Sequence, residues 1–322
     1  MNTKEKPYVI GLDLGATNSV FGIVNDKAEI ITKTTVRTTG KTDLEAYLDE
    51  CCAALAPMIA QAGGIQNIKG MGIGAPNGNF YTGNIEMAPN LPWKGTVPFA
   101  HKFSQRLGIP VTLTNDAKAA AIGEMTYGAA KGMKNFIMMT LGTGVGSGIV
   151  INGVPVYGSD GFAGELGHTT VNTTPNARLC GCGRKGCLET YCSATGVART
   201  ARELLTKTTD KSLLRTIPLD EITSKDVATA AENGDSLARE VFAFTGELLG
   251  RTCAQFTLFC SPEAFIFFGG LTNAGELIMK PIREAYDKNV MKVFKGKAKI
   301  LVSQLNGDNA AVLGAAALAV NN

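Results

Sequence analysis

Short apolar runs separated by small and polar turn residues open the chain. The first run covers residues 8–13, and two more follow at 19–24 and 29–36. Apolar runs of this length between turn signals are typical of β-strands. Because the connections between the runs are short, the pattern predicts an antiparallel meander of three strands.

Helical and extended patterns alternate after this meander. Thr42 and Glu45 have the spacing of a capping box, and the helix predicted there has one apolar stripe, made of Leu44, Tyr47, Leu48, Cys51, Leu55 and Ile59. Further elements are predicted in the order strand, short helix, strand and helix, at 68–73, 99–107, 110–114 and from Asn115-Asp116 onward.

The same order of patterns begins again near residue 136. A strand at 136–140 ends in Gly142-Thr143-Gly144, and Asn152-Gly153 has the sequence of a type I′ hairpin turn. The other predicted elements are strands at 148–151, 154–157, 264–268 and 299–302 and helices at 236–259 and 309–320. Two matching halves predict an α/β protein of two related domains with a ligand-binding cleft between them. We place the first domain at residues 1–117 and 306–322 and the second at 118–305.

Composition and charge exclude several classes of function. Of the 322 residues, 45% are hydrophobic and 18% charged, so each domain can bury a core. The net charge is +3 and no Lys/Arg run is present, so nucleic acid is not an expected partner. No apolar run is long enough to span a membrane, and the polar residues 1–6 do not resemble a signal peptide. We therefore expect a cytoplasmic protein with reduced cysteines.

Two glycine-containing loops occupy matching positions in the two halves, at 13–18 and 141–146. A hairpin of small residues lets backbone N–H groups approach an anion, and Thr17 adds a hydroxyl donor. Asp13 can hold magnesium through water, because that ion prefers carboxylate and phosphate oxygens. Each loop alone is equally consistent with a plain β-turn. Their matching positions favour a clamp on a polyphosphate.

Asp116 lies where a predicted strand ends and a helix begins. Ligands of α/β proteins collect at the carboxyl ends of strands, so Asp116 is a candidate base that takes a proton from a sugar hydroxyl during phosphoryl transfer. A helix N-terminus favours the ionised carboxylate. We expect Asp116 to be charged near neutral pH, to be a weak base and to act mainly by its position. The alternative is an aspartate that only caps the helix.

One histidine and three cysteines lie close together in the second half. His168, Cys180, Cys182 and Cys187 can supply a closed tetrahedral zinc site. The alternative is three reduced thiols in a loop. Glutamates flank this loop at 165 and 189, and carboxylates and imidazoles suit sugar hydroxyls. The other five cysteines are expected in the core, His101 at the surface and Trp93 as a hydrophobic anchor.

Together these motifs resemble the ROK family of bacterial sugar kinases and repressors, within the actin-like ATPase superfamily. The resemblance covers nearly the whole chain and rests on segments 13–18, 90–93, 115–117, 141–144, 164–168 and 180–189. It implies two actin-like, ribonuclease H-like ATPase domains that close on a sugar.

The resemblance also implies a role for each site residue. Asp116 is the base for the 6-hydroxyl of a hexose, and a structural zinc ion ties down the loop that carries His168. The hexose is bound by Asn77, Asn90, Asn115, Asp116, Glu165, His168 and Glu189. ATP and Mg²⁺ are bound by Asp13, Gly15, Ala16, Thr17, Asn18, Gly142, Thr143, Gly144, Gly269 and Gly270, with the last two near the adenosine.

Three positions depart from the family's usual motifs. Ala16 stands for a glycine in the first loop, so this position should not need a positive φ. Lys118 stands for an asparagine two residues from the predicted base. Asn77 stands for the glycine of Ala-Pro-Gly, near the 2- and 3-positions of the sugar, which leaves the identity of the hexose open.

The resemblance predicts an ATP:hexose 6-phosphotransferase, with glucose as the expected substrate and a homodimer as the expected assembly. Kinases for N-acetylglucosamine, N-acetylmannosamine, mannose, fructose or allose are alternatives, as is a sugar-responsive regulator that lacks a DNA-binding domain. A repressor needs a DNA-reading segment, and we expect none because the first strand begins at Tyr8. The zinc loop and its flanking acidic residues disfavour an actin-like ATPase without a sugar site.

Overall fold

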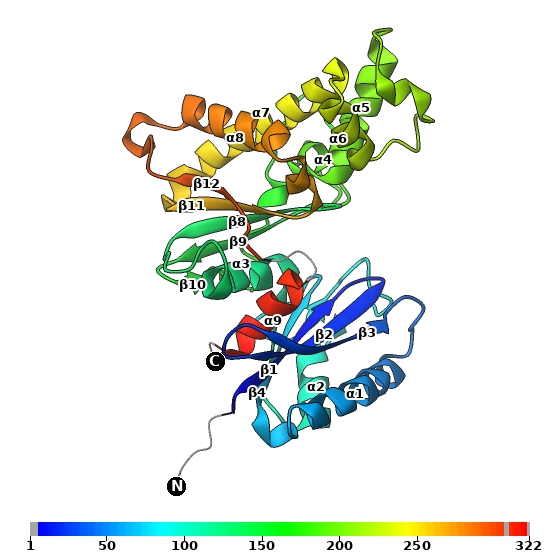
Figure 1. Ribbon diagram of the computed structural model, residues 1–322, viewed down its shortest axis with the longest axis vertical. Helices are drawn as coiled ribbons and strands as arrows, with labels where there is room; N and C mark the ends of the chain where they lie inside the picture. The colour runs from blue at the N-terminus through cyan, green and yellow to red at the C-terminus, as the bar shows by residue number, and fades with distance from the viewer. Residues whose placement is uncertain (1–5, 306–308, 321–322) are drawn as a thin grey trace. The chain divides into compact units, whose positions relative to one another are not determined.

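The chain forms two compact units, which are best described separately (Figure 1). The computed structural model describes residues 6–305 and 309–320. Of these, the residues within 1–132, 153–164 and 304–322 form the first unit, and those within 133–152 and 165–303 form the second. The sequence predicted a domain boundary at 117–118, but these residues begin a helix that packs within the first unit, and that unit continues to Gly132.

The first unit contains a five-stranded sheet in the order β3-β2-β1-β4-β7. Its strands are β1 (Tyr8–Leu14), β2 (Asn18–Asn25), β3 (Ile30–Arg37), β4 (Ile68–Ala75) and β7 (Val111–Asn115). The first three strands pair antiparallel, which confirms the predicted meander, and β4 and β7 continue the sheet parallel to β1. The carboxyl ends of β1, β4 and β7 therefore meet at one edge.

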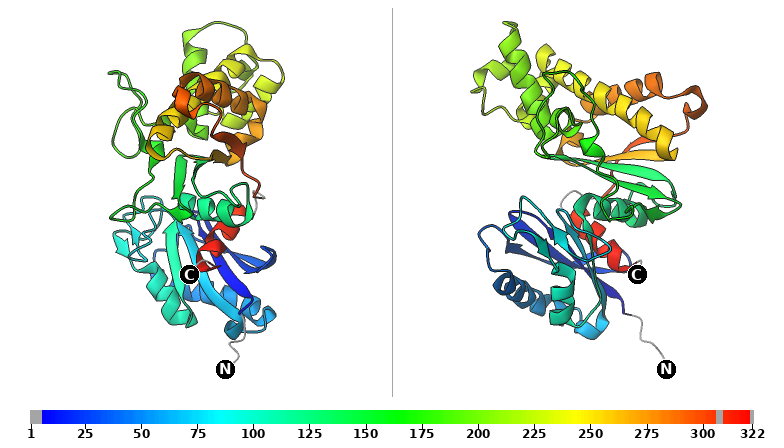
Figure 2. Two further views of the ribbon diagram at one scale, coloured as in Figure 1. Left: turned by 90° about the vertical axis from the view of Figure 1, so that its left-hand side faces the viewer. Right: turned by 180° about the vertical axis from the view of Figure 1, so that it is seen from behind.

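Helices cover both faces of this sheet: α1 (Leu44–Gln61), α2 (Phe99–Leu107), α3 (Asp116–Tyr127) and α9 (Ala310–Val320). Helices α1 and α2 lie on one face of the sheet and α9 on the other (Figure 2). Alternate residues of a strand point to opposite faces, so Ile10 and Leu12 join the core with α1 and α2, whereas Val9 packs with α9. The alanine-rich α9 lies directly on the strands, since a Cβ atom at Gly72 would collide with the Ala315 carbonyl oxygen. The unit also contains the short elements β5 (Ile85–Glu86), β6 (Thr96–Val97) and the 3₁₀ helix η1 (Ile65–Asn67).

The second sheet has the order β10-β9-β8-β11-β12. Its strands are β8 (Phe136–Leu141), β9 (Val145–Ile151), β10 (Val154–Pro155), β11 (Ala264–Phe268) and β12 (Lys299–Val302). β8 pairs antiparallel with β9 and parallel with β11, which repeats the pairing pattern of the first sheet. The helices are α4 (Glu189–Cys192), α5 (Ala194–Lys207), α6 (Ser224–Glu232), α7 (Ser236–Cys260) and α8 (Glu276–Asn289), with 3₁₀ helices η2 (Leu166–His168), η3 (Leu213–Thr216), η4 (Gly270–Ala274) and η5 (Lys292–Phe294).

Local turn and cap predictions have mixed outcomes. Both Asn152 and Gly153 have a positive φ, as the predicted type I′ turn requires. The predicted capping box at Thr42 is wrong, because the N-cap of α1 is Asp43, whose carboxylate accepts the N–H groups of Glu45 and Ala46. Among the described residues, no helix combines the length and apolar character needed to cross a bilayer.

Candidate active site

Asp13 and Asp116 lie at the edge of the first sheet where the parallel strands end. Asp13 pairs with Gly74 of β4, and the next residue of β4 pairs with Asn115 of β7. Gly74 lies beneath α3, since a Cβ atom there would be 3.5 Å from the Cα atom of Asp116. The pairing of β1, β4 and β7 thus brings together two carboxylates that lie far apart in the sequence.

Burial raises the pKa of both carboxyl groups. For Asp13, burial and the negative charge of Asp116 raise the pKa to about 6, whereas Lys33 acts to lower it. Burial also raises the pKa of Asp116, against the lowering effect of backbone N–H groups and of Lys118. Burial thus outweighs the helix terminus, and the pKa of Asp116 is raised rather than lowered.

The N-cap of α3 is Asn115 rather than Asp116. The Asn115 Oδ1 atom accepts the N–H groups of Ala117 (2.9 Å) and Lys118 (3.4 Å). The Asp116 Oδ1 atom shares the Ala117 N–H at 2.8 Å. Because Asn115 already caps the helix, a purely capping role for Asp116 is disfavoured.

Hydrogen bonds fix the carbonyl groups of the loop after β1. The Thr38 N–H donates to the Thr17 carbonyl (2.9 Å), and the Thr39 hydroxyl donates to the Ala16 carbonyl (3.2 Å). The N–H groups of Ala16 and Thr17 donate to no acceptor in the part of the chain that the structure describes. Ala16 has no positive φ, as predicted. The loop therefore has backbone N–H groups available to bind an anion.

The loop between β8 and β9 has a corresponding arrangement. Its carbonyl groups at Gly142 and Thr143 accept from the Ala194 N–H (2.8 Å) and the Thr195 hydroxyl (2.8 Å). The N–H groups of Thr143 and Gly144 find no acceptor among the described residues. Both glycine loops therefore combine fixed carbonyl groups with N–H groups available to an anion.

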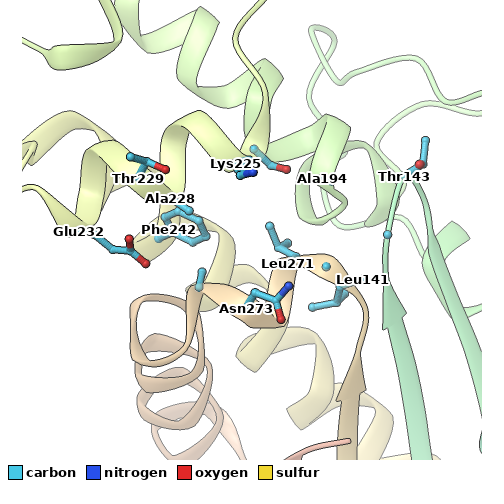
Figure 3. A pocket seen from close by; sticks show the side chains of 14 residues that line it. Leu141, Thr143, Ala194, Lys225, Ala228, Thr229, Glu232, Phe242, Leu271 and Asn273 are labelled. Atoms are coloured by element: carbon cyan, nitrogen blue, oxygen red, sulfur yellow. The ribbon is translucent and has the colours of Figure 1, made fainter. Parts of the chain in front are cut away.

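A cavity of about 610 Å³ adjoins this second loop (Figure 3). Leu141 to Thr143 form one wall, and Gly270 to Ala274 form another, with α6 opposite. Its volume lies in the range of small-molecule sites. The cavity brings Gly142 and Gly270, two residues predicted to contact one nucleotide, to the same site.

The sequence did not predict that α6 lines this cavity. Lys225, Ala228, Thr229 and Glu232 line the cavity from one helix face, and Asn273 lines it from η4 (Figure 3). Their i, i+3, i+4, i+7 spacing is visible in the sequence. A solvated surface helix has the same spacing, so the sequence alone does not indicate a binding site. The fold shows that this helix face lies in the same cavity as Gly142.

Four predicted metal ligands converge in the second unit. Their ligand atoms, on His168, Cys180, Cys182 and Cys187, lie within 4.8 Å of one another. The Cys182–Cys187 Sγ distance is 3.7 Å, and Cys180 Sγ lies 3.6 Å from His168 Nδ1. Around a tetrahedral zinc ion, two sulfurs would lie about 3.8 Å apart and a sulfur and a nitrogen about 3.5 Å apart. The residues therefore fit a closed metal site that His168 joins through Nδ1.

The two glutamates that flank the metal-ligand cluster differ in their surroundings. Glu165 is exposed at the start of η2. Glu189 is half-buried, its Oε2 atom accepts the Val145 N–H at 3.0 Å, and its Oε1 atom lies 3.5 Å from Cys180 Sγ. Glu189 thus has a contact with the glycine loop that the sequence did not indicate.

Two further residues predicted to bind sugar lie in the first unit. Asn77 has a φ of 51°, a left-handed conformation that asparagine tolerates. Its Nδ2 atom donates to the carbonyl groups of Glu86 (3.0 Å) and Met87 (3.2 Å), so this nitrogen is committed to the backbone. Asn90 is exposed.

Several predictions of core and surface placement are confirmed. Trp93 is buried against Tyr47, and His101 is exposed. The five cysteines outside the metal-ligand cluster are buried or half-buried. Lys118, by contrast, is only 2% exposed, which its charge did not suggest, and it lies close enough to Asp116 to lower the pKa of that carboxyl.

The chain is similar to known sugar kinases over nearly its whole length. The model of the ROK family matches residues 9–322. A glucokinase of Halalkalibacterium halodurans is 34% identical over 95% of this chain and 93% of its own, and one of Thermotoga maritima is 33% identical over 97% of each. The crystal structure of a ROK family glucokinase from Streptomyces griseus in complex with glucose and AMPPNP matches with a TM-score of 0.79 at 34% identity, covering 98% of this chain and 100% of that one.

Proposed function

The chain belongs to the ROK family, and we propose that it is a glucokinase that transfers the γ-phosphate of ATP to the 6-hydroxyl of glucose. Relatives named glucokinase, matched over nearly their whole length, support this proposal. The observation that carries it is the buried Asp116 carboxylate, with its raised pKa, beside Asp13 at the end of parallel strands. Such a carboxylate can take the hydroxyl proton as the sugar oxygen attacks phosphorus.

We assign the ATP base and ribose to the cavity beside Gly270 and the phosphates to the two glycine loops. The N–H groups at Ala16 and Thr17 and at Thr143 and Gly144 are the donors that support this assignment. Magnesium, when bound, neutralises phosphate charge. The assigned residues are Asp13, Gly15, Ala16, Thr17, Asn18, Gly142, Thr143, Gly144, Gly269 and Gly270.

The hexose is assigned to side chains whose oxygen and nitrogen atoms suit hydroxyl groups. These are Asn77, Asn90, Asn115, Asp116, Glu165, His168 and Glu189. We propose zinc as the metal of the Cys/His cluster, because three thiolates and one imidazole suit that ion. Its role is to hold the loop between Glu165 and Glu189. The homodimer and the cytoplasmic location belong to the same proposal.

An assay of ADP release by the purified protein tests this function. With ATP and magnesium present, we expect glucose to stimulate ADP release. Mannose, fructose, allose, N-acetylglucosamine and N-acetylmannosamine, assayed in parallel, rank the alternative substrates. Equal release with and without every sugar would indicate an actin-like ATPase. Sugar binding without ADP release would indicate a regulator.

The value of kcat/KM for glucose is expected to fall as the pH decreases below about 6. Asp13 and Asp116 both act as anions, and the pKa of Asp13 is raised to about 6. Activity is therefore expected to be lost with decreasing pH as the carboxylates bind protons. A series of initial rates at constant ionic strength measures this.

Lys118→Asn restores the family's usual residue and is expected to give an active enzyme with an altered pH profile. The Lys118 charge lowers the pKa of Asp116, so its removal should move the loss of activity to a higher pH. An unchanged profile would contradict this role of Lys118. An inactive variant would mean that the site departs from the family pattern.

A further inference from the structure

Three buried hydroxyl groups, on Ser19, Thr38 and Tyr47, lie next to the glycine loop of the first unit. Ser19 Oγ lies 2.8 Å from Thr38 Oγ1 and also bonds the Tyr47 hydroxyl. Ser19 and Thr38 are 0% exposed, and Tyr47, on α1, is 1% exposed. These three residues, here called the hydroxyl network, hold no assigned contact with ATP, magnesium or the hexose.

The hydroxyl network joins β2 and β3 where their pairing ends. Ser19 pairs with Val36, and Arg37, the last residue of β3, pairs with Asn18. Thr38 lies one residue beyond this ladder. Its side-chain bond to Ser19 therefore continues the connection between the two strands past the last ladder pair.

The backbone at Thr38 and Thr39 in turn holds the glycine loop. The N–H groups of both residues donate to the Thr17 carbonyl, at 2.9 Å and 3.2 Å, and the Thr39 hydroxyl donates to the Ala16 carbonyl at 3.2 Å. In a trans peptide the carbonyl and the following N–H point in opposite directions. Holding these two carbonyls against Thr38 and Thr39 therefore turns the N–H groups of Thr17 and Asn18 to the opposite side of the loop, where an anion can meet them.

The hydroxyl groups of the network are not needed to fill the space they occupy. A buried hydroxyl must find a partner, whereas apolar side chains of the same shape can replace a bonded pair with little change in the free energy of unfolding. The Tyr47 ring packs on Trp93 with centroids 4.7 Å apart, a contact that phenylalanine would keep. What the hydroxyl groups add is a fixed direction for the chain at Thr38.

We propose that Ser19, Thr38 and Tyr47 are positioning residues of the phosphate site. Their hydroxyl groups fix Thr38 against β2, and the backbone at Thr38 and Thr39 then keeps the glycine loop in the form that receives a phosphate. The inference rests on the proposed ATP site at this loop. It predicts that loss of the hydroxyl groups weakens nucleotide binding and leaves glucose binding unchanged.

Calorimetric titrations with AMPPNP plus magnesium, and separately with glucose, test this role. Thr38→Val and Tyr47→Phe should each raise the Kd of AMPPNP ~3–10-fold, the range of one hydrogen bond, while the Kd of glucose stays the same. The triple variant Ser19→Ala, Thr38→Val, Tyr47→Phe leaves no hydroxyl of the network without a partner. It should unfold near the wild-type temperature and still show the raised AMPPNP Kd.

A buried threonine–tyrosine pair in the second unit provides the matched control. The hydroxyl oxygens of Thr257 on α7 and Tyr286 on α8 lie 3.1 Å apart, and each residue is 1% exposed. Thr257→Val and Tyr286→Phe remove the same groups away from the glycine loop of the first unit, so the Kd values for AMPPNP and glucose should equal those of the wild type.

Two results would overturn the role of the hydroxyl network. One is a triple variant that binds AMPPNP as tightly as the wild type. The other is an equal loss of affinity for AMPPNP and for glucose, which would indicate a general loosening of the first unit. Both leave the proposed function standing, because the wild type still binds nucleotide. Wild-type protein that binds glucose but no AMPPNP would instead refute the proposed function, and the inference with it.

Discussion

Asp116→Asn is expected to lower kcat by ~10²–10⁴-fold, the usual effect of losing a general base. The amide keeps the size of the carboxylate and can still bond a sugar hydroxyl, but it cannot take the proton. The Kd for glucose should therefore change only modestly, so that the loss appears in kcat. Steady-state kinetics and calorimetry on the same preparation separate the two effects.

Asp43→Asn is the matched control for this variant. Asp43 is the N-cap of α1, so the same chemical change occurs at a helix terminus outside the proposed site. Its kcat should equal that of the wild type. Near-normal kcat in Asp116→Asn would show that Asp116 serves only the helix terminus and that another residue is the base.

Cys182→Ser is expected to abolish metal binding and to raise the glucose KM by at least ~10-fold, since even the loss of an outer-shell partner of a metal ligand costs ~10–100-fold in metal affinity or activity. Cys182 is exposed, so the substitution leaves the core intact, yet its sulfur lies 3.7 Å from Cys187 Sγ within the cluster. Without the metal, the loop carrying Glu165, His168 and Glu189 loses its cross-link.

Elemental analysis and glucose kinetics check this result. Wild-type protein should contain about one zinc per chain. Cys52→Ser, at a half-buried position of α1 in the other unit, should retain both the metal and the KM. Wild-type protein that is purified without chelators and contains no zinc would refute the assignment of the metal.

The strand pattern of both sheets was predictable from the sequence because it depends on local signals. Apolar runs, short connections and the Asn152-Gly153 dipeptide determine the meanders and the turn between β9 and β10. The N-cap residue of α1 could not be predicted, because Thr42 and Asp43 are adjacent and the side chain of either can accept N–H groups of the first turn. Choosing between them requires the backbone conformation.

The acidity of the candidate base depends on tertiary structure. The sequence places Asp116 at a helix terminus, which lowers a carboxyl pKa, but the burial that outweighs this effect arises only when β1, β4 and α3 assemble. The second contact of Glu189 is hidden for the same reason, because 44 positions separate it from Val145. Residue types predicted the candidate site, whereas the burial of its carboxylates and the contacts of Glu189 depend on the fold.

Identification of the reaction product is the most direct test of the central claim. Purified protein is incubated with ATP, magnesium and glucose, and the phosphorylated sugar is analysed by phosphorus–proton correlation NMR. The account predicts glucose 6-phosphate, formed in step with ADP by the wild type and nearly absent with Asp116→Asn. Phosphate on another hydroxyl, or ADP formed without any sugar phosphate, would contradict it.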